Sequence, residues 1–215
     1  MIVIPKDKQK HYDVICEFIR YINSKYQNDF VLKGGTSLML CYGLDRFSED
    51  IDLDGFTKNI IPIVTEFCKQ KGYTCNVNKD TPTVKRVMIH YDNEHLLKVE
   101  VSYRNRERQP DRYKVINDIN VYDIEALLSM KLNAYANRDK IRDLYDVTFI
   151  YNHYANILNQ DILYLLSDTL AYKGLEQFDY LIATQSDELI NNDKLSDDFL
   201  TMWNTLGLLD DKTRE

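Results

Sequence analysis

Glycine and proline divide this 215-residue chain into two differently built parts. All four prolines and five of the seven glycines lie before residue 111, and residues 111–173 contain neither. Because these two residues are the strongest local turn signals, the first part can fold as short strands and helices, whereas the second favours long helices. The sequence therefore predicts an α+β region followed by a mostly helical C-terminal region, as one large domain or a domain with a helical appendage.

Hydrophobic periodicity places the individual elements. We expect strands at 30–32, 51–53, 74–77, 83–91 and 96–103. We expect helices at 8–23, 37–42, 60–70, 123–136, 143–154, 158–172 and 196–206. Gly72 and Gly207 are predicted to end two of these helices, and Ser196 is predicted to cap the last one.

Composition excludes several classes of protein. A hydrophobic share of 44% is ordinary for a globular chain and too high for a disordered one. No apolar stretch approaches the roughly 18–20 residues that span a bilayer, and the N-terminus lacks the apolar region of a signal peptide. The four cysteines form no C-x-x-C pair and indicate reduced thiols. We therefore expect a cytoplasmic protein without a membrane partner.

The net charge of −7 is unevenly distributed. Residues 155–215 contain 4 basic and 12 acidic side chains, which leaves 23 basic and 22 acidic ones in residues 1–154. The overall acidity argues against a protein that coats nucleic acid non-specifically. It leaves open a local nucleic-acid site in the nearly neutral part, where residues 104–114, including Arg104, Arg106 and Arg108, are basic.

The sharpest local feature is the alternating segment Asp50-Ile51-Asp52-Leu53. Side chains alternate between the faces of a strand, so Asp50 and Asp52 point the same way while the apolar residues enter the core. Two carboxylates on one rigid face suit a hard divalent cation such as Mg²⁺ or Mn²⁺. Asp54 continues that face, either as a third ligand or as a solvated neighbour. Seen alone, the pattern more often describes a half-exposed strand with polar outer positions.

A second candidate, Gly34-Gly35-Thr36, lies between an expected strand and an expected helix. Paired glycines permit a tight turn whose N–H groups reach a phosphate at the helix N-terminus, and Thr36 would supply a hydroxyl at the N-cap. A tight turn with an ordinary threonine cap is the simpler alternative. Arg46 and Ser48 are further candidates for phosphate or acceptor contacts, although such loop residues are usually solvated.

A third carboxylate comes from the alternating segment 98–102, in which Glu100 points away from the valines. If this strand lies beside 51–53, Glu100 completes a triad with Asp50 and Asp52. Metal ions held by such a triad can clamp the attacking and leaving oxygens of a phosphoryl displacement. An exposed lysine–glutamate patch on the outer sheet face is the alternative.

Several blocks together resemble AbiEii-type nucleotidyltransferases, toxins of bacterial type IV toxin–antitoxin systems in the DNA-polymerase-β-like superfamily. The blocks occur in the order of that family and cover about residues 30–150, at 33–38, 45–53, 98–102, 130–134, 138 and 142–147. As a set they are much more specific than any one of them.

The resemblance implies a nucleotidyltransferase-like mixed sheet with flanking helices in residues 1–115. The helical region 116–215 would complete the active site with about residues 120–150 and end in an acidic helical tail at 155–215. The implied site residues are Gly34, Gly35 and Thr36 for the nucleoside triphosphate (NTP), Asp50, Asp52 and Glu100 for metal and catalysis, and Lys131, Arg142, Asp143 and Asp146 in later motifs where a lysine and an aspartate are required.

Spacing adds one geometric expectation. If the helix after Asp123 continues, then Lys131, Tyr135, Arg138 and Arg142 form one stripe, which could bring positive charge to a triphosphate. A solvated basic helix face supported by acidic neighbours is the alternative.

The function expected from the sequence is metal-dependent transfer of a nucleoside monophosphate (NMP) from NTP to an acceptor hydroxyl. The resemblance implies an RNA acceptor such as a tRNA 3′ end, and a cognate antitoxin. Three alternatives stay open: a non-catalytic nucleotide- or RNA-binding module, a metal-dependent nuclease on the same fold, and nucleotidyl transfer to a small molecule or protein.

Overall fold

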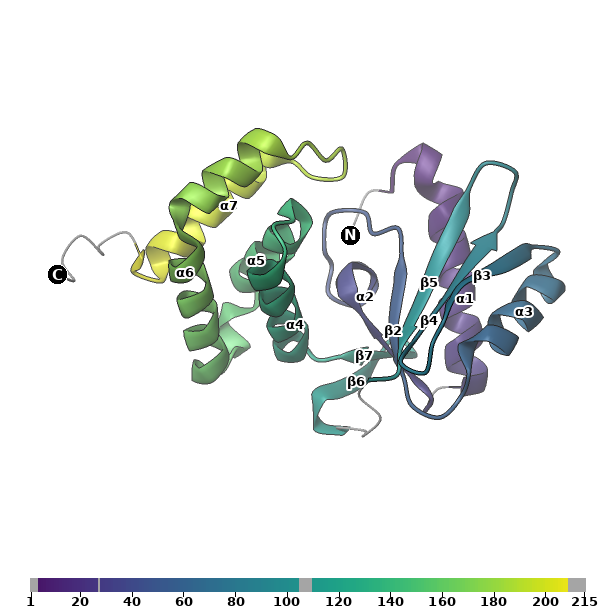
Figure 1. The fold of residues 1–215 in the computed structure, drawn as a ribbon. Coiled ribbons are helices and arrows are strands. Elements are labelled where there is room, and N and C mark those ends of the chain that lie inside the picture. Colours follow the sequence, from purple (N-terminus) through teal and green to yellow (C-terminus); the bar gives the residue numbers. More distant parts are fainter. Residues whose placement is uncertain (1–3, 27, 105–109, 209–215) are drawn as a thin grey trace. The chain divides into compact units, whose positions relative to one another are not determined.

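The computed structural model describes residues 4–26, 28–104 and 110–208, and the chain divides into two compact units, Met1–Asp123 and Ile124–Glu215 (Figure 1). The first unit combines a mixed sheet with helices, and the second is helical. The fold class predicted from the sequence is therefore confirmed.

The first unit is built on a seven-stranded sheet in the order β3-β4-β5-β2-β1-β7-β6. The parallel pairs are β2 with β5 and β1 with β7, and all other neighbours are antiparallel. The strands are β1 Phe30–Lys33, β2 Ile51–Gly55, β3 Thr74–Asp80, β4 Val84–His90, β5 Leu96–Ser102, β6 Tyr113–Ile116 and β7 Ile119–Tyr122. Their inward-facing residues, such as Ile51, Leu53 and Val99, are fully buried, as the alternation predicts.

Among the described residues of this unit, three α-helices accompany the sheet: α1 (Gln9–Tyr26), α2 (Gly34–Cys41) and α3 (Ile60–Lys71). The buried rings of Phe18 on α1 and Phe67 on α3 meet edge to face, with centroids 5.1 Å apart, so these two helices pack together. Gly72 ends α3 in the left-handed conformation, as expected.

The hairpin β6–β7 is absent from the sequence-based prediction. Its turn is made by Asn117 and Asp118, which have φ values of 50° and 63°. Asn and Asp tolerate this left-handed region better than other non-glycine residues, so a tight turn forms in a stretch without glycine or proline. The absence of glycine and proline from residues 111–173 therefore did not exclude a turn.

The second unit contains four α-helices among its described residues: α4 (Ile124–Asn137), α5 (Ile141–Tyr154), α6 (Gln160–Thr184) and α7 (Asn192–Thr205). Gly174, with φ 73° and ψ 169°, breaks α6 into two segments, and only the first was predicted. The prediction that Ser196 caps the last helix is wrong, because Asn191 caps α7 by accepting a hydrogen bond from the N–H of Lys194. Phe178 and Phe199 stack at 4.1 Å and join α6 to α7.

Within the described part of the chain, no helix is long and apolar enough to cross a membrane. All four cysteines have free thiols, and only Cys68 is buried.

Candidate active site

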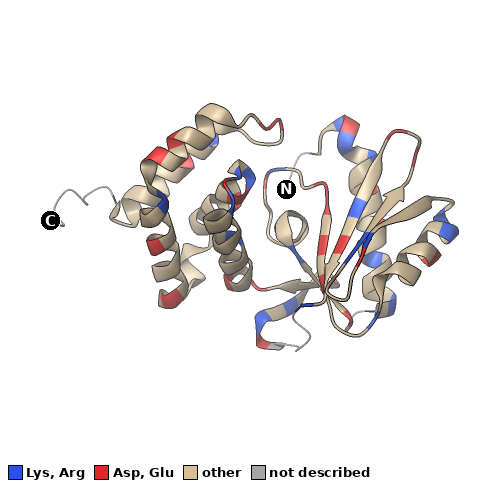
Figure 2. Cartoon of the chain, in the orientation of Figure 1, with Lys and Arg blue, Asp and Glu red and all other residues tan. Residues whose placement is uncertain are grey.

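The acidic residues singled out in the sequence lie on two neighbouring parallel strands. Asp52 lies on β2, Asp50 directly precedes that strand, and Glu100 lies on β5 opposite Asp52 in the register. Figure 2 shows acidic positions along β2 and both signs of charge on β5. Side chains at paired positions of adjacent strands share one face, so the adjacency on which the proposed triad depends is present.

Basic side chains hold the two outer carboxylates. Lys98 Nζ lies 2.5 Å from Asp50 Oδ2, and Arg86 Nη2 lies 2.6 Å from Glu100 Oε2. Both pairs are partly exposed to solvent. Arg86 is directly opposite Glu100 in the antiparallel β4–β5 register, so this second pair is a cross-strand ion pair.

Asp52 lies in the register between Glu100 on β5 and Lys33 on β1 and has an unusual environment. Burial raises its pKa above the ordinary value for an aspartate. The positive charge of Lys98 lowers the pKa, while the negative charges of Asp50 and Glu100 raise it further. The surroundings of Asp52 therefore disfavour its charged form, mainly through burial, although Lys98 and Lys33 favour that form.

No group of three or more His, Cys, Asp or Glu side chains is arranged to hold a metal ion among residues 4–26, 28–104 and 110–208. The donor chemistry nevertheless fits a hard divalent cation, because carboxylate oxygens from Asp50, Asp52 and Glu100 are the ligands that Mg²⁺ takes. A cation there would also favour the charged form of Asp52, which burial disfavours.

Gly34 packs directly against Asp52, and Gly35 packs against Ser48 and Arg46 in the segment that leads to the acidic strand. Gly34 begins α2 with φ +75°, and a Cβ built there would lie 2.8 Å from Asp52 Oδ2. A Cβ on Gly35 would lie 2.7 Å from Ser48 Oγ and 2.9 Å from Arg46 Nη2. Glycine is therefore required for close approach at both positions, and at Gly34 also for the backbone conformation.

Thr36 does not cap α2, contrary to the prediction, because the helix begins two residues earlier with Lys33 at the N-cap. Its buried hydroxyl instead hydrogen-bonds the carbonyl of Asp50 and lies 3.0 Å from Ser48 Oγ. Arg46 and Ser48 are also buried, so the expectation that such loop residues are solvated is wrong for both. These contacts fix the start of α2 against the segment that leads into β2.

Asp54 is neither solvated nor open to a ligand. Its side chain is 1% exposed; Lys33 Nζ lies 2.5 Å from Oδ1, and the hydroxyl of Tyr122 donates to Oδ2 at 2.8 Å. This pairing of Asp54 joins β1, β2 and β7, and the sequence did not predict it.

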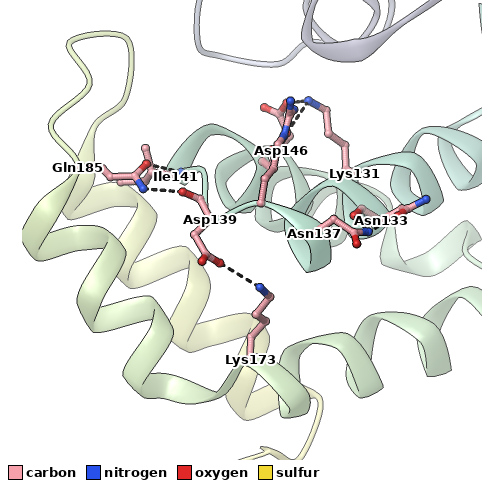
Figure 3. Close-up of polar contacts among 10 residues, drawn as sticks. Lys131, Asn133, Asn137, Asp139, Ile141, Asp146, Lys173 and Gln185 are labelled. Atoms are coloured by element: carbon pink, nitrogen blue, oxygen red, sulfur yellow. Dashed lines mark hydrogen bonds and ion pairs between the residues drawn. The ribbon is translucent and has the colours of Figure 1, made fainter.

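A second charged cluster lies entirely within the helical unit. Lys131 Nζ is 2.6 Å from Asp146 Oδ2 and 3.4 Å from Asp143 Oδ1, as Figure 3 shows for Asp146. Arg138 makes a two-point contact with Asp143 at 2.7 and 3.0 Å. Asp143 and Asp146 are almost fully buried, and Lys131 is 11% exposed. The sequence-predicted residues Lys131, Asp143 and Asp146 are thus brought together on α4 and α5.

The predicted basic stripe along one helix is wrong. The first helix ends at Asn137, and residues 138–140 connect it to α5, so Lys131 and Arg142 lie on different helices. Arg142 forms an ion pair with Asp187, which precedes α7. Gln185 hydrogen-bonds the backbone of Asp139 and Ile141, which further ties the α4–α5 connection to the end of α6 (Figure 3).

Part of the basic segment 104–114 lies outside the described residues. This applies to Arg106 and Arg108. Arg104 and Arg112 are described and exposed.

Sequence reasoning missed the basic partners of the acidic cluster, Lys98 and Arg86. The alternation of 98–102 already placed Lys98 on the same strand face as Glu100. Which charged residue lies opposite Lys98 or Glu100 on a neighbouring strand depends on strand register. The order β4-β5-β2 supplies that information and is not encoded locally.

Three carboxylates on adjacent parallel strands, beside a strand–Gly-Gly–helix turn, place the first unit among nucleotidyltransferase folds. JHP933 from Helicobacter pylori is similar, with a TM-score of 0.79 and 27% identity over 96% of this chain and 94% of that protein. A candidate nucleotidyltransferase of H. pylori has a TM-score of 0.77 and 26% identity over 98% of this chain and 99% of its own. Among curated proteins the chain has no significant match.

Residues 18–212 match the family described as nucleotidyl transferase AbiEii toxin, type IV TA system. The match covers most of the chain, so the protein belongs to the AbiEii family and is a nucleotidyltransferase. The resemblance read from the sequence motifs is thereby confirmed.

Proposed function

We propose that the protein is a metal-dependent toxin that transfers NMP from NTP to the terminal hydroxyl of an RNA, such as a tRNA 3′ end. The observation that carries this proposal is the contact between the Gly34 turn and Asp52, which lies opposite Glu100 on the adjacent strand. This close approach supports a site in which the backbone of the turn binds phosphate beside the acidic side chains, within one unit of the fold. Family membership supports the toxin role and a cognate antitoxin as partner.

In this proposal each residue has a defined task. The N–H groups at the start of α2, from Gly34 to Thr36, bind the triphosphate at the positive end of the helix dipole. Asp50 and Asp52 would hold Mg²⁺ or Mn²⁺, which neutralises charge on the reacting phosphates when bound. Asp50 must then exchange Lys98 for the cation, and the partial exposure of that pair permits the exchange.

Glu100 accepts the proton of the acceptor hydroxyl as its oxygen attacks the α-phosphorus. One O–P bond forms, the bond to the β-phosphate oxygen breaks, and pyrophosphate leaves. Catalysis consists mainly of positioning and charge compensation. Arg46 and Ser48 support this site by holding Gly35 and Thr36 in place.

Lys131, Arg142, Asp143 and Asp146 are proposed to serve the same reaction from the helical unit, on the basis of the family resemblance. Because Lys131, Asp143 and Asp146 are buried and paired with one another, removing any one of them should also destabilise that unit. Any test of their role in catalysis therefore needs a parallel measurement of stability.

The proposal is tested by incubating the protein with each labelled NTP and total RNA in the presence of Mg²⁺. Label should enter RNA, and pyrophosphate release should require both NTP and RNA. Asp50→Ala and Asp52→Ala should each lower the rate by about 10³-fold, the scale of losing a preorganised charge interaction. Asp80→Ala, an exposed aspartate at the end of β3, is the matched control and should keep full activity.

Each alternative has its own signature in this experiment. RNA cleavage without NTP would indicate a nuclease, and NTP binding without label transfer would indicate a non-catalytic module. Label appearing in a small molecule or a protein would replace the RNA acceptor. Transfer activity retained within tenfold in Asp52→Ala would contradict the assigned metal site.

A further inference from the structure

A cavity of about 480 Å³ opens beside Asp50, within the first unit. Its wall comes from the beginning of α1, from the segment that leads into β2, and from the loop between β4 and β5. Figure 1 shows the start of α1 and this loop at the same end of the unit. The volume is typical of sites that hold small organic groups. Because Asp50 lines the cavity, any group bound there lies next to the proposed reaction centre.

One wall of the cavity is aromatic and apolar. The rings of Tyr91 and His95 are nearly parallel, with an angle of 11° and centroids 6.2 Å apart. His95 is exposed, and the neighbouring Leu96 is 43% exposed, so both present surface to an incoming group. Flat surfaces of this kind stack nucleobases of any sequence.

Hydrogen bonds fix this wall relative to Asp50. One ring nitrogen of His11, Nδ1, lies 2.6 Å from the hydroxyl of Tyr91, and the other, Nε2, lies 2.7 Å from the carbonyl of Glu49. Glu49 is the residue before Asp50, so His11 connects the aromatic wall to the acidic strand. A wall held in this way needs little reordering when a ligand binds.

The charges around the cavity limit what it can hold. Five acidic residues line it against two lysines. A run of phosphates would be repelled, whereas carboxylates readily accept hydrogen bonds from the exocyclic amino group of a base. Lys10 extends over the ring of Tyr91, is largely exposed and pairs with Asp92, so it can contact one phosphate at the rim.

We infer that this cavity binds the terminal nucleoside of the RNA acceptor, with its base against His95 and Leu96 and its free hydroxyl towards Asp50. Only the phosphate on the 5′ side of that nucleoside contacts the protein here, through Lys10. This inference rests on the proposed function, since it assigns the acceptor site of the same reaction. It explains how a site with an excess of negative charge receives the end of a polyanion: the end that enters carries no phosphate.

Binding tests the inference without requiring turnover. The probe is a 5′-fluorescein-labelled cytidine–cytidine–adenosine trinucleotide with a free 3′-hydroxyl, followed by fluorescence anisotropy. His95→Ala should weaken binding by about 5- to 150-fold, the equivalent of one stacked base. His90→Ala is the matched control and should bind as the wild type does, because His90 lies on β4, contacts Asn76 and does not line the cavity.

Two further measurements define the orientation of the bound nucleoside. The same trinucleotide carrying a 3′-phosphate should bind at least tenfold more weakly, because that phosphate would enter the acidic cavity. Lys10→Gln should lower the slope of log Kd against log salt by about 0.7, as expected for the loss of one phosphate contact to a single strand.

Equal binding by His95→Ala and wild type, or equal binding of the 3′-phosphorylated probe, would overturn the acceptor site. Failure of the proposed function is recognised separately, by absent label transfer in the RNA assay. Trinucleotide binding that depends on His95 in the absence of transfer would keep the site and reject the reaction.

Discussion

The two charged clusters of the molecule differ in burial. In the sheet unit, Asp50 and Lys98 form a pair in which the side chains are 45% and 29% exposed. In the helical unit, Lys131 is 11% exposed and its partner Asp146 is completely buried. The nitrogen–oxygen distance is similar in the two pairs, 2.5 Å for Lys98–Asp50 and 2.6 Å for Lys131–Asp146, so distance alone does not distinguish the two clusters.

The difference shows which ions can exchange partners. Separating a partly exposed pair costs little, because water solvates both charges, whereas separating a buried pair leaves charge in an apolar interior. Asp50 and Glu100 can therefore leave their basic partners at little cost, while Asp143 and Asp146 stay bound to Lys131 and Arg138. Four substitutions test this contrast.

The largest effect is expected for Lys131→Ala. Two buried carboxylates lose their lysine, so the free energy of unfolding of the helical unit should fall by about 3–5 kcal/mol. Urea unfolding followed by circular dichroism measures this. Lys194→Ala, in a partly exposed i,i+4 pair on α7, is the control and should change it by less than about 1 kcal/mol. Similar losses in the two variants would abolish the distinction between the clusters.

Gly34→Ala comes next. A non-glycine residue at φ +75° costs about 1–3 kcal/mol, and the added Cβ also displaces the Asp52 carboxylate. Gly43→Ala separates these effects, because Gly43 has φ +76° and open space around it. Both variants should lose thermal stability, but only Gly34→Ala should also lose transfer activity. Equal activity in both would remove Gly34 from the site.

Asp52→Asn should stabilise the protein at neutral pH while abolishing transfer. Burial raises the pKa of Asp52, so the folded state disfavours its charged form, and removing the charge relieves that penalty. A gain of about 1 kcal/mol would raise the Tm by roughly 2–4 °C in a chain of this size. The gain should be full above the raised pKa and vanish as the pH falls to the ordinary aspartate value of about 3.9. A lower Tm at neutral pH would contradict the assigned penalty.

The smallest effect is expected for Lys98→Ala. Because its pair with Asp50 is partly exposed, the free energy of unfolding should change by no more than about 1 kcal/mol. Thermal unfolding of Lys98→Ala and Lys131→Ala, each measured against the wild type, compares the stability lost from the exposed pair with that lost from the buried pair. A loss of several kcal/mol would mean that Asp50 depends on its lysine as strongly as Asp146 does.

Local sequence pattern predicted the acidic strands well and the connections poorly. Alternation in 50–53 and 98–102 placed Asp52 and Glu100 on the strand face opposite the buried apolar residues, because a period of two depends only on neighbouring residues. The pairing of Lys98 with Asp50 required strand register, which depends on distant contacts. The roles of Lys131, Asp143 and Asp146 came from family resemblance, and their mutual ion pairs became visible only in the structure.

The errors have specific physical causes. The Asn117–Asp118 turn contains neither glycine nor proline, so a rule based on those residues passed over it. The break at 138–140 agrees with the predicted helix bounds of 136 and 143, and only the stripe that assumed one continuous helix ignored it. Ser196 matched the pattern of a cap, but Asn191 lies at the actual helix start and forms the hydrogen bond. Several residue types can make a turn or a cap, and tertiary packing selects among them.

The parallel pairing of β1 with β7 has a consequence for the order in which the protein is made. Leu32 pairs with Val121, so one side of the strand that leads into Gly34 stays open until that later strand has emerged from the ribosome. Contacts between such distant residues form slowly, because a long loop must close first. The nascent chain therefore cannot complete the pairing of β1 early in synthesis, and the proposed phosphate-binding turn that follows this strand is held on both sides only after more than half of the polypeptide has been translated.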